Sequence, residues 1–279
     1  MTLAQKKRLR LIILGILTIG AAALYIYPVF LMVINSLKSF REVIIDVIAL
    51  PSRLVFQNYS YVIDKMNYGR LFFNNVIITV VGILGIVGFS SLAAYILDRK
   101  RNRYTKIAQL LIITPMLIPF QTFMITLLKT MNTFHLSGSL LGLGIQYWGF
   151  GIPMATFIYV NFMRTIPREI DESAFIDGAS TFQTFRHVIF PILKPVTTTV
   201  VVLDVMWIWN DFLLPLLMVN SSEKTKTLVL SAYTFVGQYN TQWHYAMTAM
   251  VLAVVPSVIF FVLLQKYIVE GVVAGAIKG

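Results

Sequence analysis

The chain of 279 residues contains no cysteine, little charge and only three histidines. The absence of cysteine excludes disulfide bonds, thiolate metal sites and cysteine nucleophiles. Charged residues make up 13% of the chain, about half the share of an ordinary soluble domain, whereas hydrophobic residues make up 57%. This composition excludes a typical soluble monomer and directs attention to long apolar runs.

The usual signatures of catalysis are missing as well. No Gly-Lys dipeptide occurs, so the chain cannot form a phosphate-binding P-loop, and the hydrolase pattern G-x-S-x-G is absent. His135, His187 and His244 lie far apart, and none has a histidine or carboxylate at metal-ligand spacing. We therefore predict no catalytic residue, no metal site and no cofactor in this chain, which makes a membrane enzyme a remote alternative.

Four glycines between residues 142 and 151 superficially resemble a dinucleotide-binding fingerprint. They are Gly142, Gly144, Gly149 and Gly151, and their spacing does not fit that motif. Small residues inside a membrane span allow neighbouring helices to approach closely. We therefore assign close helix packing to all four.

Six apolar runs are each long enough to cross a bilayer as a helix. They are residues 11–34, 72–97, 107–128, 140–162, 196–219 and 246–264. Continuous runs favour helices over the alternating strands of a β-barrel, and the first run is longer than the apolar region of a signal peptide. We predict an all-α polytopic membrane protein with six transmembrane helices in a single domain, residues 1–279.

Positive charge is distributed unevenly between the segments that join these runs. Residues 1–10, 98–106, 163–195 and 265–279 contain 15 Lys and Arg in 67 residues, against 8 in 74 on the opposite side. The positive-inside rule places both termini in the cytoplasm. The densest basic cluster, at residues 99–106, is interpreted as an orientation signal. We therefore expect membrane lipid, and no nucleic acid, around the chain.

The cytoplasmic loop at residues 164–195 is the most informative segment. Pro167 fits the first turn of a helix, and acidic residues at positions 169, 171 and 172 complement the positive end of the helix dipole. Gly178 suits the left-handed position that follows the end of a helix. We predict a short helix over about 167–177 and a positive φ at Gly178.

A second short helix is predicted directly after this turn. Ser180 is a candidate N-cap, and Phe182, Phe185 and Ile189 recur at helical spacing until Pro191, which we expect to end the helix. Two amphipathic helices expose more apolar surface than a linker requires. The residues alone leave open whether the pair packs on a partner, on this chain's own bundle or on lipid headgroups.

The loop also carries a family signature. Glu172-Ser-Ala-Phe-Ile-Asp177-Gly178, followed by Ile189-Phe-Pro191, resembles the cytoplasmic motif E-A-A-x-x-x-G and I-x-L-P of binding-protein-dependent ABC permeases, with Ser173 and Phe190 as departures. From about residue 25 onward the chain is similar to the maltose-type carbohydrate permeases. The matching residues outside the loop are Asn58-Tyr59, Ala93-Ala94-Tyr95 through Arg99, Pro115, Pro119, Pro167, Trp209-Asn210-Asp211-Phe212, Pro215-Leu216 and Gln265 through Gly279.

The resemblance implies an import subunit of a bacterial or archaeal cytoplasmic membrane. Its implied partners are a second, homologous permease chain, two ATPase subunits that bind ATP and magnesium, and an extracytoplasmic sugar-binding protein. The loop would couple to the ATPase, and the C-terminal tail would reach the ATPase interface. The implied coupling residues are Glu172, Ala174, Asp177, Gly178, Phe182 and Phe185, and those of the tail are Gly275, Lys278 and Gly279.

Two carboxylates lie inside the fifth apolar run. Asp204 and Asp211 are seven residues apart, almost two helical turns, so we expect them to share a helix face with Trp207 between them. A carboxylate in a membrane faces a cavity or a partner. Contact with a sugar on the translocation path and a brace against the partner permease both fit. A self-contained, ion-coupled transporter using Asp204 is the alternative function, although such a carrier requires neither the loop signature nor the tail.

Overall fold

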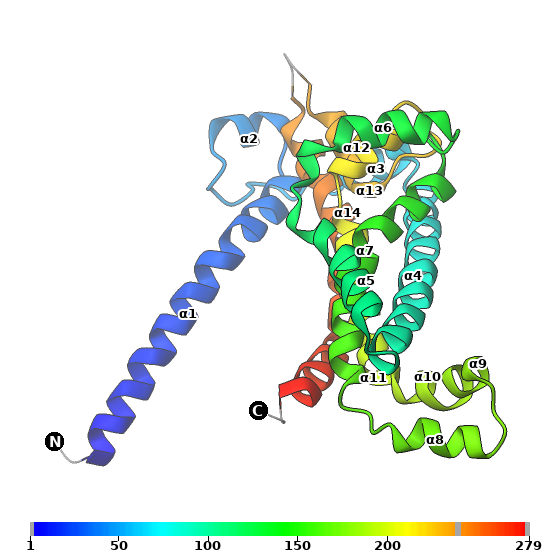
Figure 1. Cartoon of the computed structure of the whole chain (residues 1–279). Coiled ribbons are helices and arrows are strands. Elements are labelled where there is room, and N and C mark those ends of the chain that lie inside the picture. The colour runs from blue at the N-terminus through cyan, green and yellow to red at the C-terminus, as the bar shows by residue number, and fades with distance from the viewer. Residues whose placement is uncertain (1–2, 238–240, 277–279) are drawn as a thin grey trace. The chain divides into compact units, whose positions relative to one another are not determined.

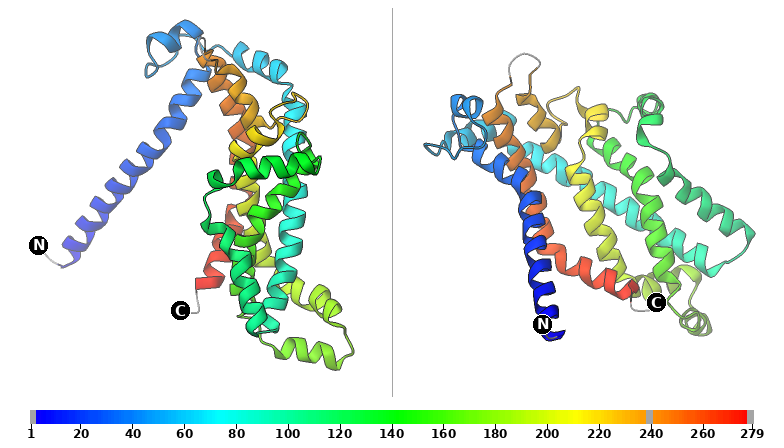
Figure 2. Two further views of the ribbon diagram at one scale, coloured as in Figure 1. Left: turned by 45° about the horizontal axis from the view of Figure 1, so that its top comes forward. Right: turned by 90° about the vertical axis from the view of Figure 1, so that its left-hand side faces the viewer.

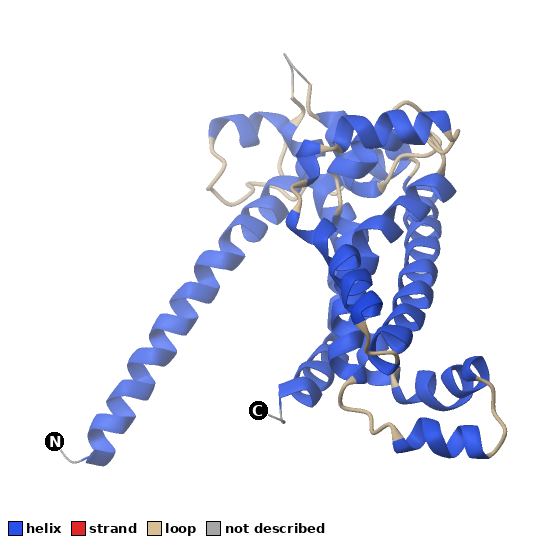
Figure 3. Cartoon of the chain, viewed as in Figure 1, coloured by secondary structure: helices blue, strands red, loops and turns tan. Residues whose placement is uncertain are grey.

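The computed structural model describes residues 3–237 and 241–276, and every regular element in these ranges is helical (Figure 3). This confirms the predicted all-α class. The longest helices are α1 (Leu3–Ser36), α4 (Tyr68–Arg99), α7 (Leu140–Met163), α11 (Lys194–Asn210) and α14 (Trp243–Ala276), which Figure 1 labels. The shorter elements are α2 (Phe40–Ile45), α3 (Gln57–Met66), α5 (Arg103–Ile113), η1 (Thr114–Leu117), η2 (Phe120–Thr122), α6 (Met124–Thr133), α8 (Glu169–Ile176), α9 (Thr181–Thr184), η3 (Phe185–Ile189), α10 (Phe190–Ile192), α12 (Leu213–Val219), α13 (Leu228–Ala232) and η4 (Tyr233–Phe235).

The residues form two compact units. The first contains Met1–Tyr68 and Ser231–Ala253, and the second contains Gly69–Leu230 and Val254–Gly279. In the first unit, the side chains of α1 are exposed from Leu11 to Phe30, as expected where lipid is the solvent. Its C-terminal end is held by polar side chains, because the Asn58 amide donates to the Ser36 and Lys38 carbonyls at 2.9 and 2.8 Å. These bonds satisfy carbonyls that the end of a helix leaves free.

The core of the second unit lies around α4, α7 and α11, and glycines set the distance between α7 and α4. A Cβ added at Gly144 would lie 2.7 Å from the Val81 side chain, and one at Gly151 would lie 2.3 Å from Ile86. A Cβ at Gly142 would lie 1.9 Å from the Leu136 carbonyl oxygen. The prediction of close helix packing is confirmed at Gly144 and Gly151, whereas Gly142 lies against the connection that precedes its own helix. The prediction is wrong at Gly149, where an added Cβ would meet no atom within 4 Å.

Two of the six predicted spans are interrupted. Residues 107–128 are divided among α5, two 3-10 turns and α6, because Pro115 and Pro119 lack the N–H groups that a continuous helix needs. Residues 196–219 are divided at Asp211, whose backbone is extended (φ −70°, ψ 135°), between α11 and α12. The apolar runs in the sequence therefore predicted that these two segments exist, but they did not predict the breaks in their helices.

Within residues 3–237 and 241–276, three helices are long and apolar enough to span a membrane. They are the segments Arg10–Ser36, Tyr68–Arg99 and Trp243–Gln265, and a fourth candidate is the pair Thr181–Ile192 and Lys194–Asn210, which is bent by 75°. The predicted spans at 11–34, 72–97 and 246–264 fall inside the three segments. The count of six is not confirmed by length and composition of the described helices.

Candidate functional site

The loop at residues 164–195 forms a helical hairpin at one end of the second unit (Figure 2). After α8, Gly178 has a φ of +82°, which confirms the predicted left-handed position. Its N–H donates to the Phe175 carbonyl at 3.1 Å, and the N–H of Ala179 donates to the Ala174 carbonyl at 3.0 Å. These two bonds make a Schellman motif, which ends α8 and reverses the chain.

The second helix of the hairpin begins where the sequence predicts. Ser180 is the N-cap of α9: the N–H of Gln183 donates to its Oγ at 3.4 Å, and its own N–H donates to Gln183 Oε1 at 2.8 Å. The expectation that Pro191 ends this helix is wrong. A wider π-helical turn, η3, follows α9, and Pro191 lies in the first turn of α10, where a proline N–H is not needed.

A buried carboxylate ties the hairpin to the end of α4. Asp171 is 4% exposed, and its Oδ1 accepts a hydrogen bond from the Tyr95 hydroxyl at 2.8 Å. Its Oδ2 accepts from Arg99 Nε at 2.9 Å, and Arg99 Nη2 lies 2.8 Å from the same oxygen. Charge-assisted bonds of this kind are short and strong, so they fix α8 against α4.

Further ionic contacts surround this junction. Arg99 Nη1 lies 2.8 Å from Asp98 Oδ2, and Arg101 pairs with the other oxygen of Asp98. Arg168, at the start of α8, donates to the Asp98 carbonyl at 2.9 Å. We call Asp98, Arg99, Arg101, Arg168 and Asp171 the arginine–aspartate network. It joins the N-terminal end of α8 to the last turn of α4.

The predicted coupling residues fall into an exposed and a buried set. Glu172, Asp177 and Phe182 are exposed, as are two apolar side chains of α8, Phe175 and Ile176. Ala174 and Phe185 are buried inside this chain, and the Phe185 ring lies 5.4 Å from that of Tyr95. The buried pair belongs to the packing of the hairpin and leaves the exposed set as the outward face.

The predicted tail residues are only partly covered by the structure. Gly275 belongs to α14, which continues to Ala276, whereas Lys278 and Gly279 lie outside the described residues. The ATPase contact predicted for these three residues stays a prediction.

The carboxylates of the fifth run lie in different backbone settings. Asp204 is buried on α11, but Asp211 caps the end of that helix, so the two do not share one continuous helical face as predicted. The reason is local: Asp211 Oδ1 accepts the N–H of Leu213 at 3.0 Å and starts a new helix. Asp211 Oδ2 accepts the Tyr147 hydroxyl at 2.9 Å, which binds the break to α7.

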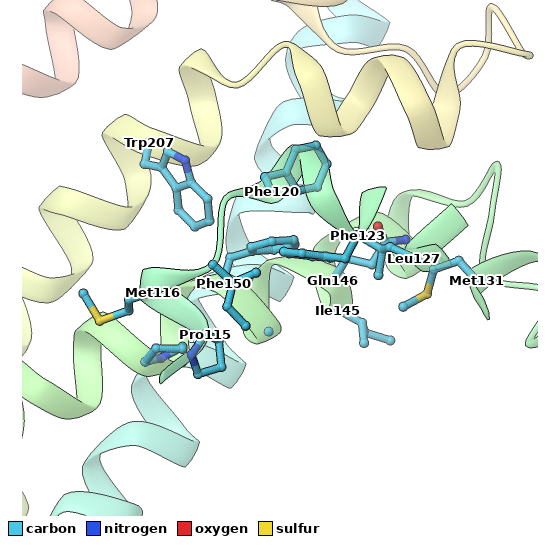
Figure 4. A pocket seen from close by; sticks show the side chains of 13 residues that line it. Pro115, Met116, Phe120, Phe123, Leu127, Met131, Ile145, Gln146, Phe150 and Trp207 are labelled. Atoms are coloured by element: carbon cyan, nitrogen blue, oxygen red, sulfur yellow. The ribbon is translucent and has the colours of Figure 1, made fainter. Parts of the chain in front are cut away.

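A cavity of about 460 Å³ lies beside the two interrupted segments (Figure 4). Phe120, Phe123, Phe150 and Trp207 line it, and the Phe123 and Phe150 rings are stacked at 5.9 Å. Gln146 on α7 also lines it. A second cavity of about 200 Å³ shares the Phe120, Phe150 and Trp207 walls and includes Asp211. We call the larger one the aromatic cavity.

The sequence did not predict two features of these sites. Tyr95 and Arg99 were recognised only as matches to a family pattern, and Asp171 only as a helix-dipole residue, so the bonds among them are seen only in the structure. Their signal was the co-occurrence of Tyr and Arg at an i, i+4 spacing at the end of an apolar run. Gln146 had a signal as well, because it is a polar residue inside such a run.

No group of three or more metal-binding side chains lies together in the part of the chain that the structure describes. The described site residues therefore present ion pairs, apolar surface and an aromatic cavity.

Comparison with known proteins places these features in a family. The family model for the binding-protein-dependent transport system inner membrane component matches residues 86–273. The chain is 38% identical to the probable starch degradation products transport system permease protein AmyC of Thermoanaerobacterium thermosulfurigenes, over 98% of this chain and 99% of AmyC. It is 32% identical to the melibiose/raffinose/stachyose import permease protein MelC of Bacillus subtilis, over the whole of both chains.

A solved structure shares the fold. A chain from the crystal structure of a bacterial ABC transporter involved in the import of the acidic polysaccharide alginate matches with a TM-score of 0.78 and 22% identity, over 94% of this chain and 97% of that chain. The family model covers well over half of the sequence, and AmyC aligns along nearly all of it. The chain therefore belongs to the inner membrane components of binding-protein-dependent transport systems.

Proposed function

We infer that the chain is the permease subunit of an ATP-driven, binding-protein-dependent importer of sugars or oligosaccharides. Family membership supports the transport role, and the relatives AmyC, MelC and the multiple sugar-binding transport system permease protein MsmG of Streptococcus mutans are all named for sugars. A self-contained carrier coupled to ions through Asp204 does not fit a family whose members depend on a binding protein. This chain is a non-catalytic transport subunit.

The hairpin of α8 to α10 is the observation that carries the coupling role. It is a short, capped structure whose base is tied to α4 by Asp171 and Arg99 and whose outward face includes Phe175 and Phe182. A hairpin held in this way transmits a displacement to α4, which a disordered loop does not. We propose that Glu172, Asp177 and Phe182 contact a partner ATPase, while Ala174 and Phe185 hold the hairpin in shape and Gly178 sets its turn.

The remaining subunits follow from this role. ATP and magnesium bind to two ATPase subunits, a homologous permease chain completes the translocation path, and an extracytoplasmic protein delivers the sugar. The tail residues Gly275, Lys278 and Gly279 contact the ATPase interface in this proposal. Asp204, Trp207 and Asp211 belong to the translocation path, and the position of Trp207 and Asp211 on adjoining cavities supports that choice over a brace for the partner permease.

The proposed topology has six crossings and both termini in the cytoplasm of a bacterium or archaeon. Two of the crossings, at residues 107–128 and 196–219, are interrupted helices. Because the chain has no cysteine of its own, single cysteines report orientation directly. A cysteine replacing Lys100 should be shielded from an impermeant reagent in intact cells, and one replacing Lys224 should react. The opposite pattern would contradict the orientation.

Purification from the native host tests the function itself. We expect an ATPase and a second permease chain to co-purify, and we expect proteoliposomes of the complex to import sugar only with internal ATP and an external binding protein. A complex without ATPase hydrolyses no ATP and is the matched control. Ion-driven sugar transport by this polypeptide alone would contradict the proposal.

A further inference from the structure

We propose that the loop between α2 and α3 lies in the membrane interface and inserts apolar side chains among the lipids, in the leaflet opposite to the N-terminus. Large apolar side chains at the end of α2 and in this loop are exposed. Ile45 is 71% exposed, Ile48 66% and Leu50 70%. An exposed apolar surface of this kind marks a contact with a membrane or a protein. We call the following side chains the outer apolar patch: Ile44, Ile45, Val47, Ile48, Leu50 and Leu54.

Backbone polar groups of the same loop are bonded to side chains of the protein. The Asp46 carbonyl accepts a hydrogen bond from the Lys38 ammonium at 2.9 Å, and the Val47 carbonyl accepts one from the Asn35 amide at 2.8 Å. Lys38 and Asn35 are each 1% exposed. Asp46 Oδ1 accepts the N–H of Ile48 at 2.8 Å. Protein groups thus replace water at this backbone, which a loop among lipids requires because lipid tails offer no hydrogen bonds.

The rest of the loop is closed in the same way. The Ser52 N–H donates to Glu42 Oε1 at 3.1 Å, and the Val55 N–H donates to the Leu37 carbonyl at 2.8 Å. A loop in water can leave such groups to the solvent and presents polar side chains outward. This loop has the reverse arrangement, because its backbone is bonded to the protein and its aliphatic side chains point outward. The arrangement favours lipid over water as its surroundings.

The attachment of the loop to α1 places it at the depth of the lipid headgroups. The span Arg10–Ser36 has 27 residues. At ~1.5 Å per residue it is about 40 Å long, close to the thickness of a bilayer with its headgroup regions, about 40 to 45 Å. The bonds from Asn35 to Val47 and from Val55 to Leu37 hold the loop beside the C-terminal end of this helix (Figure 1). The outer apolar patch therefore lies next to the surface that α1 exposes to lipid.

Charge near the patch favours lipid over a protein partner. Arg41 precedes the patch and Arg53 lies near its end, and both are exposed. Guanidinium groups bind phosphate oxygens, which lipid headgroups carry. Cations beside an apolar face are typical of segments that lie in the membrane interface. A protein that covers the patch is the competing occupant, and the experiment below separates it from lipid.

Spin labels on single cysteines test the surroundings of the patch. Ile48→Cys carries the label in the patch, and Lys65→Cys, an exposed charged position on α3, is the control. The complex that purifies with the chain, with cysteines of its other subunits replaced, is reconstituted in vesicles of phosphatidylethanolamine and phosphatidylglycerol. Power saturation is measured with oxygen and with a water-soluble nickel chelate. Insertion by about 5 to 10 Å should make the ratio of oxygen to nickel accessibility about tenfold higher at residue 48 than in the control.

A charge placed in the patch should withdraw the loop from lipid. Ile48→Asp is combined with Leu50→Cys, and the label at residue 50 reports the change. A carboxylate is costly among lipids, so we expect nickel accessibility at residue 50 to rise about fivefold, towards that of Lys65→Cys. Ile48→Val keeps the apolar character, is the matched control and should leave the accessibility unchanged. Residue 48 is exposed, so neither substitution disturbs the core.

The outcomes are distinct. A label at residue 48 that nickel reaches as readily as the control would show that the loop lies in water, and a label that neither oxygen nor nickel reaches would show that a protein covers the patch. Either result would overturn the lipid contact, as would nickel accessibility that Ile48→Asp leaves unchanged. The measurement requires no transported sugar. Absence of ATP-driven sugar uptake by wild type would contradict the proposed function and leave the lipid contact standing.

Discussion

The arginine–aspartate network and the aromatic cavity differ in the hydrogen bonding of their buried polar side chains. Asp171 is 4% exposed and has Tyr95 and Arg99 as partners within 2.9 Å. Gln146 is equally buried, and neither amide atom has a partner. Paired groups stabilise one geometry. A buried group without a partner carries a desolvation cost that no hydrogen bond offsets. In the proposed function, the paired region transmits motion between the hairpin and α4.

Asp171→Ala should have the largest effect, because it removes the carboxylate that Tyr95 and Arg99 bind and leaves the partly buried Arg99 paired with Asp98 alone in the network. Breaking one side of a buried ion pair is destabilising by about 3 to 5 kcal/mol. We expect a lower thermal unfolding temperature for the purified complex and loss of sugar uptake. Glu169→Ala, an exposed acidic residue on the same helix, is the control and should change little. Normal uptake and melting of Asp171→Ala would mean that the network does not hold the hairpin.

Gly178→Val should have the next largest effect. A β-branched residue at a φ of +82° is strained by about 1 to 3 kcal/mol, although an added Cβ would meet no atom within 4 Å. The strain is relieved if α9 swings away from α8, which separates the two halves of the outward face. We expect normal membrane insertion, with uptake lost or uncoupled from ATP hydrolysis in proteoliposomes.

Gly178→Asn is the matched variant, because asparagine tolerates the left-handed conformation far better than valine. It should retain most of the uptake. Full activity of both variants, with unchanged ATPase stimulation, would indicate a passive connector instead of a coupling hairpin.

Gln146→Leu should shift stability in the opposite direction from Asp171→Ala. Replacing an unsatisfied buried amide by an apolar group of similar size removes a desolvation penalty, so the free energy of unfolding should rise by about 1 kcal/mol. Thermal unfolding of the complex without sugar measures this directly, with Gln109→Leu as the control. A destabilised Gln146→Leu would imply that the amide has a structural partner, and the contrast between the two regions would fail.

The sequence predicted the parts of the fold that local chemistry determines. Three features depend on residues within a few positions of one another: the cap at Ser180, the left-handed Gly178 and the helix before it. They could therefore be predicted from the sequence. The all-α class followed from long apolar runs in the same way. The family resemblance could be recognised for a similar reason, since the motif in the loop occupies a continuous stretch of sequence.

Long-range and backbone-level features were not predictable in this way. The bond between Tyr95 and Asp171 joins residues 76 positions apart, and no periodicity reports it. The break at Asp211 depends on a side chain competing with its own backbone, which an apolar average over 196–219 hides. The empty space beside Gly149 depends on which face of α7 packs against α4, and the sequence does not show this. The cavity depends on long-range contacts, on breaks in the helices and on which helix faces pack together. It could therefore be found only in the structure.

The smallest expected effect concerns a third case, a carboxylate that is paired but only partly buried. Glu42, at the start of α2, accepts hydrogen bonds from the Ser52 hydroxyl, from the Ser39 N–H at 3.0 Å and from the Ser39 hydroxyl at 2.9 Å. These bonds, the one from the Ser52 hydroxyl first, lower the pKa of Glu42 to about 2. Because Glu42 is only partly buried and its partners lie within ten residues of it, this pairing should stabilise only the local segment.

The depressed pKa fixes the sign of the pH dependence. The stabilisation by ionised Glu42 is fully present above its unfolded pKa of about 4.3 and is lost as the pH falls through the folded pKa of about 2. Hydrogen exchange of peptides containing Ser52, whose N–H donates to Glu42 at 3.1 Å, should show more protection in wild type than in Glu42→Gln at pH 5. The difference should disappear near pH 2, while Asp64→Asn, in the same unit, should follow wild type throughout. If the difference in protection between wild type and Glu42→Gln did not depend on pH, the ionised carboxylate would not be what stabilises this segment. The contrast between paired and unpaired polar groups would then not extend to Glu42.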